Sequence, residues 1–182
     1  TARYEKAHGA DNWKAAYSAY WTDIGNPRRN GRPKLVWGDD RAWRYQTWDE
    51  RGRETLRLDQ RDGSECPVAA LWGGTPLTLT NLPAGIVCTA TVMDYEGHAG
   101  DSNHSDEFAS PRTVTMHLVR DGASTVISRT WHIYSHATNT YAAVTRRTIR
   151  AHSAIAAIGD SGNAVSAETS FHADAPGVPL LL

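Results

Sequence analysis

Residues 41–58 place the strongest constraint on the fold, because they read as a strand, a tight turn and a second strand. In the first arm, Trp43, Tyr45 and Thr47 alternate with polar side chains, and aromatic and β-branched residues suit a pleated surface. The stretch Asp49-Glu50-Arg51-Gly52 predicts the turn, since the aspartate can cap it and the glycine can take a positive φ. We therefore predict a β-hairpin here.

Most of the remaining chain also shows the residue patterns and turn residues that are typical of β-hairpins. Of its 182 residues, 40% are hydrophobic, which is enough to bury a core and makes disorder unlikely. From residue 75 onward β-branched residues dominate and turns recur every 10–15 residues, with a hairpin signal at Asp121-Gly122. The predicted fold is mainly β, an antiparallel sheet of consecutive long β-hairpins, with a β-sandwich as the alternative. We expect strands at 34–37, 77–80, 86–95, 113–119, 125–134, 141–150 and 164–171, and a loop at 66–74.

The first 24 residues are the one stretch in which a helix is predicted. Asp11-Asn12 can cap it, and aromatic and alanine side chains recur at spacings of three and four, although the aromatic density at 17–21 suits a strand equally well. The apolar face of this helix consists of Trp13, Ala16, Tyr17, Tyr20 and Trp21. We divide the chain into an N-terminal segment (1–30), the hairpin unit (31–63) and a β-hairpin region (64–182), expected to form one continuous structural unit.

The net charge, the hydrophobic runs and the two cysteines argue against several classes of function. The formal net charge of −1 gives no electrostatic reason to expect nucleic acid, and no apolar run approaches the roughly 20 residues of a membrane span. Cys66 and Cys88 are not part of a Cys-x-x-Cys pair, so a structural zinc site has little support. A Cys66–Cys88 disulfide and two separate buried thiols both remain open.

The hairpin and the residues before it resemble a known repeat. The run from Gly31-Arg32-Pro33, followed by Trp43, Tyr45, Trp48-Asp49 and Gly52-Arg53, resembles a YD-repeat unit of the Rhs and teneurin-like group. Trp48 stands where the signature tyrosine is usual, and Asp39-Asp40 replaces the usual Asp-Gly. The resemblance covers about 31–63. Over 111–182 the chain only broadly resembles the irregular spacer sequences that lie between YD units in large bacterial surface proteins.

The resemblance implies a non-catalytic role and no cofactor. In that family, consecutive hairpins build a curved β-sheet that closes into a shell, which encloses a toxin domain or presents it at the cell surface. It implies a secreted or cell-surface location, with other repeats or other chains as partners. In this reading Asp49 caps the turn, Gly52 takes the strained conformation, and Arg53 pairs with acids or stacks on Trp48. One unit cannot bury its aromatic face alone, so we expect a piece of something longer.

Two alternative functions, from other classes of protein, remain open. The polar loop at 98–107 carries residue types that bind divalent metals, which would suit a small metal-dependent hydrolase. The same composition is also ordinary for an exposed loop. Its candidate ligands are His98, Asp101, His104 and Asp106, with Glu107 beside them. In a carbohydrate-binding module, Trp37, Trp43, Tyr45 and Trp48 would stack on sugar rings, whereas the same residues could equally form the core between hairpins.

Overall fold

The computed structural model describes residues 2–6, 13–38, 42–63, 65–72, 75–99, 101, 110–138, 141–173 and 179–180. Side chains are described for these residues except 2–6, 13–16, 136–138, 141–144, 170–173 and 179–180.

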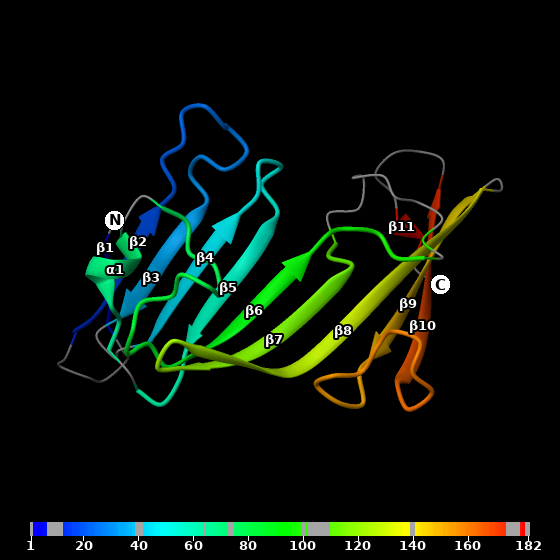
Figure 1. Cartoon of the computed structure of the whole chain (residues 1–182). Helices are drawn as coiled ribbons and strands as arrows, with labels where there is room; N and C mark the ends of the chain where they lie inside the picture. Colours follow the sequence, from blue (N-terminus) through cyan, green and yellow to red (C-terminus); the bar gives the residue numbers. More distant parts are fainter. Residues whose placement is uncertain are drawn as a thin grey trace. The chain divides into compact units, whose positions relative to one another are not determined.

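Strands dominate the described chain (Figure 1). They follow one another in a single sheet in which each strand is hydrogen-bonded to its neighbours in the sequence, from β1 to β11. The predicted mainly β fold of consecutive antiparallel hairpins is therefore confirmed, and the two-sheet sandwich is not formed by the described strands. The elements are β1 (Ala2–Lys6), β2 (Trp13–Tyr20), β3 (Pro33–Gly38), β4 (Trp43–Trp48), β5 (Glu54–Gln60), α1 (Val68–Trp72), β6 (Cys88–Asp94), β7 (Thr113–Arg120), β8 (Ala123–Thr138), β9 (Tyr141–Arg150), β10 (Ala164–Ala173) and β11 (Pro179–Leu180).

The chain divides into two compact units, which are described separately below. The first comprises residues 1–92 and 116–126, and the second comprises residues 93–115 and 127–182. The two segment boundaries proposed from the sequence, at residues 30 and 63, both lie within the first unit. No described helix has the length and apolar character needed to cross a membrane.

A row of buried residues crosses five strands of the first unit. Direct cross-strand partners connect one residue from each of β2 to β6, and all of them point to the same face. The exposed fractions along the row are 9% for Ala19, 1% for Leu35, and 0% for Tyr45, Leu58 and Ala90. The opposite face carries an ion pair, in which Arg44 Nε donates to Asp59 Oδ1 at 2.6 Å. The period-two alternation of the sequence thus separates core from solvent.

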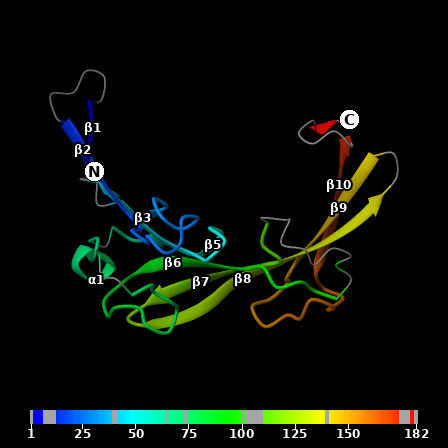
Figure 2. The same ribbon diagram turned by 90° about the horizontal axis from the view of Figure 1, so that it is seen from above.

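The connection between β5 and β6 covers this buried face. Leu71 of α1, Leu77 and Ile86 are buried in the same hydrophobic cluster as Leu35 and Tyr45. Figure 2 shows α1 to one side of β3. The Tyr45 hydroxyl accepts a hydrogen bond from the Leu77 backbone N–H at 3.1 Å, and its burial raises the pKa of this phenol. A segment without a strand of its own therefore completes the core.

The predicted N-terminal helix is wrong, because this segment forms β1 and β2. The reason is visible at the end of β2 and in the residue that follows it. Ala19 and Trp21 are buried while Tyr20 between them is 47% exposed, so the apolar period is two, not three to four. Tyr17 lies opposite Trp37 on β3, and their rings stack with centroids 5.2 Å apart. Pairing with β3 decides the structure of a segment whose local pattern was ambiguous.

Two further predictions between β5 and β6 need correction. The apolar piece expected as loop forms α1, and residues 77–80, expected as a strand, have no regular secondary structure. Asn81 explains the second case, because its Oδ1 accepts a hydrogen bond from the Thr78 N–H at 2.6 Å and competes with strand pairing. By contrast, the Asp121-Gly122 turn is confirmed, with φ of 52° and 78° as a type I′ hairpin turn requires.

Candidate functional site

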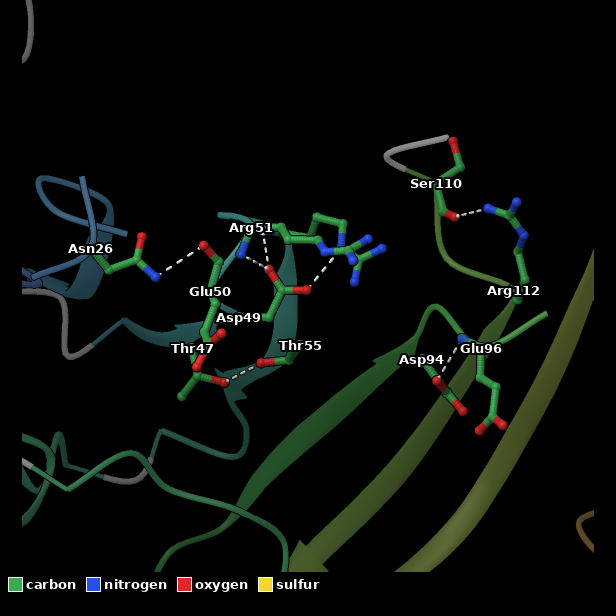
Figure 3. A network of polar contacts seen from close by, with 11 residues as sticks. Asn26, Thr47, Asp49, Glu50, Arg51, Thr55, Asp94, Glu96, Ser110 and Arg112 are labelled. Carbon is green, nitrogen blue, oxygen red and sulfur yellow. Dashed lines mark hydrogen bonds and ion pairs between the residues drawn. The ribbon is translucent and has the colours of Figure 1, made fainter. Parts of the chain in front are cut away.

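The turn that joins β4 and β5 is held together by hydrogen bonds to one carboxylate. Asp49 Oδ1 accepts hydrogen bonds from the N–H groups of Arg51 and Arg53, each at 2.9 Å (Figure 3). Asp49 Oδ2 accepts from Arg53 Nε at 2.7 Å. Burial alone would raise the pKa of Asp49, but these hydrogen bonds and the charge of Arg53 outweigh it and lower that pKa. The carboxylate therefore stays ionised and holds the turn together.

The loop before β3 packs against this turn. Asn26 Nδ2 donates to the Glu50 carbonyl at 2.9 Å (Figure 3), and Gly52 adopts a φ of +76° beside the backbone of Arg28. A Cβ at Gly52 would lie 2.6 Å from the Arg28 carbonyl oxygen, so the position requires glycine for both its conformation and its space. The roles expected of Asp49 and Gly52 match this geometry.

The structure gives Arg53 an acidic partner, one of its two expected roles, and places Arg32 against Trp48. Arg53 pairs with Asp49, whereas Arg32 lies over the Trp48 ring with its guanidinium carbon 5.1 Å from the ring centroid. Trp48 Nε1 donates to the Pro33 carbonyl at 2.7 Å. These contacts join the turn to the start of β3, so every described contact of the motif is structural.

The aromatic group expected to bind sugars is largely buried. Trp43 is 4% exposed and Tyr45 is fully buried, so neither presents a ring face to solvent. Trp37 and Trp48 pack against the same core. Core packing, the other interpretation left open in the sequence, therefore describes this group.

The polar loop after β6 contains a buried ion pair of the second unit. Arg112 Nε lies 3.2 Å from Asp101 Oδ2, and the two side chains are 3% and 0% exposed. Asp101 also accepts hydrogen bonds from the backbone N–H groups of His98 (3.3 Å) and Tyr134 (2.5 Å). Arg112 Nη1 donates to the Ser110 carbonyl at 2.9 Å (Figure 3), and its guanidinium carbon lies 4.5 Å from the Tyr134 ring centroid. Both carboxylate oxygens are thus occupied by protein donors.

These contacts decide what two of the predicted metal ligands do. His98 Nε2 lies 3.1 Å from the Arg112 carbonyl oxygen and 2.8 Å from Thr113 Oγ1, so this nitrogen carries the proton and donates. Among the described residues there is no group of three or more potential metal ligands. His104 and Asp106 lie outside the described residues, and their part in a metal site stays a prediction. His98 and Asp101 fasten the loop to β7 and β8.

Sequence reasoning missed Arg112 and Tyr134 as partners of Asp101. Their separations of 11 and 33 residues from Asp101 follow no local period, so no spacing signal could have connected them. The charge of Arg112 was visible in the sequence, but its burial was not.

His132 supplies a prediction for the pH dependence of stability. Its burial and the nearby charge of Arg146 lower its pKa in the folded protein, and its Nδ1 lies 3.1 Å from Thr148 Oγ1. Below the unfolded-state pKa of about 6.5 the unfolded chain therefore binds a proton that the folded chain does not. We expect stability to fall as the pH drops from 7 toward 5.5, measured by urea unfolding at each pH.

Two substitutions check the assignment of this pH dependence. His132→Gln should flatten the slope of stability against pH in that window, and Arg146→Gln should reduce it because one of the two causes is removed. An unchanged slope in His132→Gln would show that other groups carry the dependence.

The cysteines supply a second prediction. Both are free thiols in the structure, with Cys88 buried and Cys66 half-buried. Burial raises the pKa of Cys66 to about 11, and burial with the charge of Asp59 raises that of Cys88 to about 12. The thiolate is the reactive form, so at pH 8 we expect iodoacetamide to modify folded Cys66 about 100-fold more slowly than in urea, and Cys88 more slowly still. Mass spectrometry of each peptide measures both rates.

Equal rates in buffer and in urea would contradict this prediction. Recovery of fewer than two thiols in urea without reductant would support the disulfide instead.

Comparison of the chain with protein-family models, with curated proteins and with solved structures found no match. The fold and the described contacts therefore define only the class of protein. It is an antiparallel β protein of sequential hairpins, in which each polar cluster described above fixes a turn or a loop.

Proposed function

We propose that the chain is a non-catalytic structural segment of a large secreted or cell-surface protein of the YD-repeat, Rhs-like type. Its strands would form part of the wall of a β-shell that encloses or presents a toxin or adhesive domain. The observation that carries the proposal is the strand order, because every strand pairs with its sequence neighbours and the sheet grows by one hairpin after another. A wall built from repeated hairpins needs this connectivity.

The motif contacts support the same role. Asp49, Gly52 and Arg53 close a turn, and the loop 21–32 packs on that turn through Asn26 and Arg28. The metal-dependent hydrolase has less support, since His98 and Asp101 are used to hold a loop.

Electron microscopy of the full-length protein that carries this segment tests the proposal. The Asp121-Gly122 turn is exposed, and a Cβ at Gly122 would meet nothing within 4 Å, so this turn can accept an epitope tag. A second tag at Gly159, which is equally open, is the matched control for position. We expect antibody fragments against each tag to decorate the wall of a hollow particle. A solid particle, or labels on an appendage outside the wall, would overturn the proposal.

A further inference from the structure

Three turns of the first unit contain asparagine or aspartate followed by glycine, a pair of residues that can react with itself. The pairs are Asn30-Gly31, Asp62-Gly63 and Asp121-Gly122. In such a pair the glycine nitrogen can attack the side-chain carbonyl carbon of the preceding residue, because glycine has no side chain to hinder the approach. The three glycines have similar left-handed φ angles of 75°, 67° and 78°, so their own conformation does not distinguish them.

The reaction balances with water as the only added reagent. The glycine nitrogen loses its proton and bonds to the side-chain carbon, while ammonia leaves from asparagine or water leaves from aspartate. Water then opens the resulting succinimide ring at one of its two carbonyl carbons. Opening at one carbonyl gives aspartate, and opening at the other gives isoaspartate, in which the main chain runs through the side-chain carbon.

The sequence by itself points to Asn30 as the most reactive of the three residues. At neutral pH an aspartate side chain is almost entirely ionised, and a carboxylate is a poor target for a nucleophile. The asparagine side chain is a neutral amide and has no such barrier. In an unfolded chain, Asn30 should therefore react before Asp62 and Asp121.

The folded structure protects Asn30. The Gly31 N–H, which carries the attacking nitrogen, donates a hydrogen bond to the Trp21 carbonyl at 2.9 Å. Asn30 Oδ1 belongs to the group that would be attacked, and it accepts a hydrogen bond from the Asp23 N–H at 3.3 Å. Both reacting groups must leave these partners before the ring can close. The reactive conformation is therefore rare while the loop stays folded.

The Asp121-Gly122 turn lacks this protection. Both residues are exposed at the tip of the hairpin formed by β7 and β8. Among the described residues, the Asp121 side chain has no hydrogen-bond or ion-pair partner, and the Gly122 N–H has no acceptor. A Cβ at Gly122 would meet nothing within 4 Å, so the space around the turn is open. The two groups can approach each other without breaking a described contact.

Asp62 is an intermediate case. The Asp62-Gly63 pair is exposed, but Asp62 Oδ2 lies 3.6 Å from Arg120 Nη2, and Asp62 Oδ1 lies 4.0 Å from Arg61 Nε. These ion pairs compete with the approach of the carboxyl group to the Gly63 nitrogen. Because exposed ion pairs contribute little in water, they should slow the reaction only moderately.

We propose that Asp121 is a site of spontaneous isoaspartate formation in the folded chain, whereas Asn30 is protected although its own chemistry is the more reactive. Isoaspartate would add one carbon atom to the main chain of the turn. A type I′ turn matches the twist of its two strands, so this addition should weaken the hairpin of β7 and β8. The reaction is independent of the proposed shell role, because it needs only this turn and water.

Asp121→Asn compares the same pair of residues at two places in one molecule. In this variant asparagine precedes glycine at positions 30 and 121, and the turn keeps a favoured type I′ sequence. Peptide mapping by mass spectrometry measures deamidation at both positions, in neutral buffer and in urea. We expect equal rates in urea. In buffer, position 121 should deamidate about tenfold or more faster than Asn30, because only Asn30 must first break two hydrogen bonds.

The unaltered chain tests Asp121 itself. During long incubation in neutral buffer, isoaspartate should accumulate at Asp121 and more slowly at Asp62, measured by peptide mapping and by enzymatic methylation of the isoaspartyl carboxylate. Asp121→Glu is the control, since it keeps the charge but would need a larger ring, and the signal at the turn should disappear. Equal rates at positions 30 and 121 of folded Asp121→Asn would overturn the proposal. So would an Asp121 that reacts in urea and stays unmodified in the folded chain.

Discussion

Asp101→Asn should destabilise the protein by about 3–5 kcal/mol, because it leaves the Arg112 guanidinium buried without its carboxylate partner. The substitution is nearly isosteric, and the new amide oxygen can still accept the hydrogen bond from the Tyr134 N–H. It therefore removes the charge while largely keeping the shape. Urea unfolding followed by circular dichroism measures the change in the free energy of unfolding.

The second unit contains a matched exposed pair for comparison. Arg146 Nη2 lies 2.5 Å from Glu168 Oε2, with side chains 47% and 66% exposed. Glu168→Gln should cost about 0–1 kcal/mol, since exposed ion pairs gain little in water. The double variant Asp101→Asn/Arg112→Met should be no less stable than Asp101→Asn alone, because it also removes the stranded charge. A loss below about 1 kcal/mol in Asp101→Asn would mean that the pair does not anchor this loop.

Gly52→Ala should be the most damaging single change in the motif of the first unit. The new Cβ would lie 2.6 Å from the Arg28 carbonyl oxygen, and the backbone would keep a φ of +76°. A left-handed conformation costs an L-residue about 1–2 kcal/mol, and forcing a backbone apart adds about 1–3 kcal/mol. We expect a total loss of about 3 kcal/mol in the free energy of unfolding, measured in urea.

Gly31→Ala separates the two causes of that loss. Gly31 has nearly the same φ, +75°, but a Cβ there would meet nothing within 4 Å. It should therefore show the conformational cost alone, about 1–2 kcal/mol. Equal losses in the two variants would show that the loop 21–32 does not press on the turn in solution.

The hairpin could be predicted in detail because its signals are local. Alternating side chains decide which face of a strand is apolar, and Asp49 and Gly52 satisfy the turn within a few residues of sequence. The same holds for Asp121-Gly122 and for β9, whose predicted bounds agree with the structure. Each of these elements can be derived without knowing what packs against it.

Prediction failed where a segment supports two local interpretations. The aromatic and alanine residues of 13–21 fit a helical period as well as a strand, and pairing of β2 with β1 and β3 decides between them. Residues 77–80 alternate like a strand, but they cover the core as an irregular segment anchored to the Tyr45 hydroxyl. Helix or strand preference is weak compared with the free energy of burial in a particular tertiary context.

The sequence by itself determined the class of fold and the chemistry of its turns, since both depend on residues that are neighbours along the chain. Only the tertiary structure decided which polar residues are buried and which aromatics are exposed. Asp101 is half of a buried ion pair, Tyr45 lies in the core, and Tyr20 and Trp72 stay exposed. The physical reason is that burial is set by segments far apart in the sequence, which no local period connects.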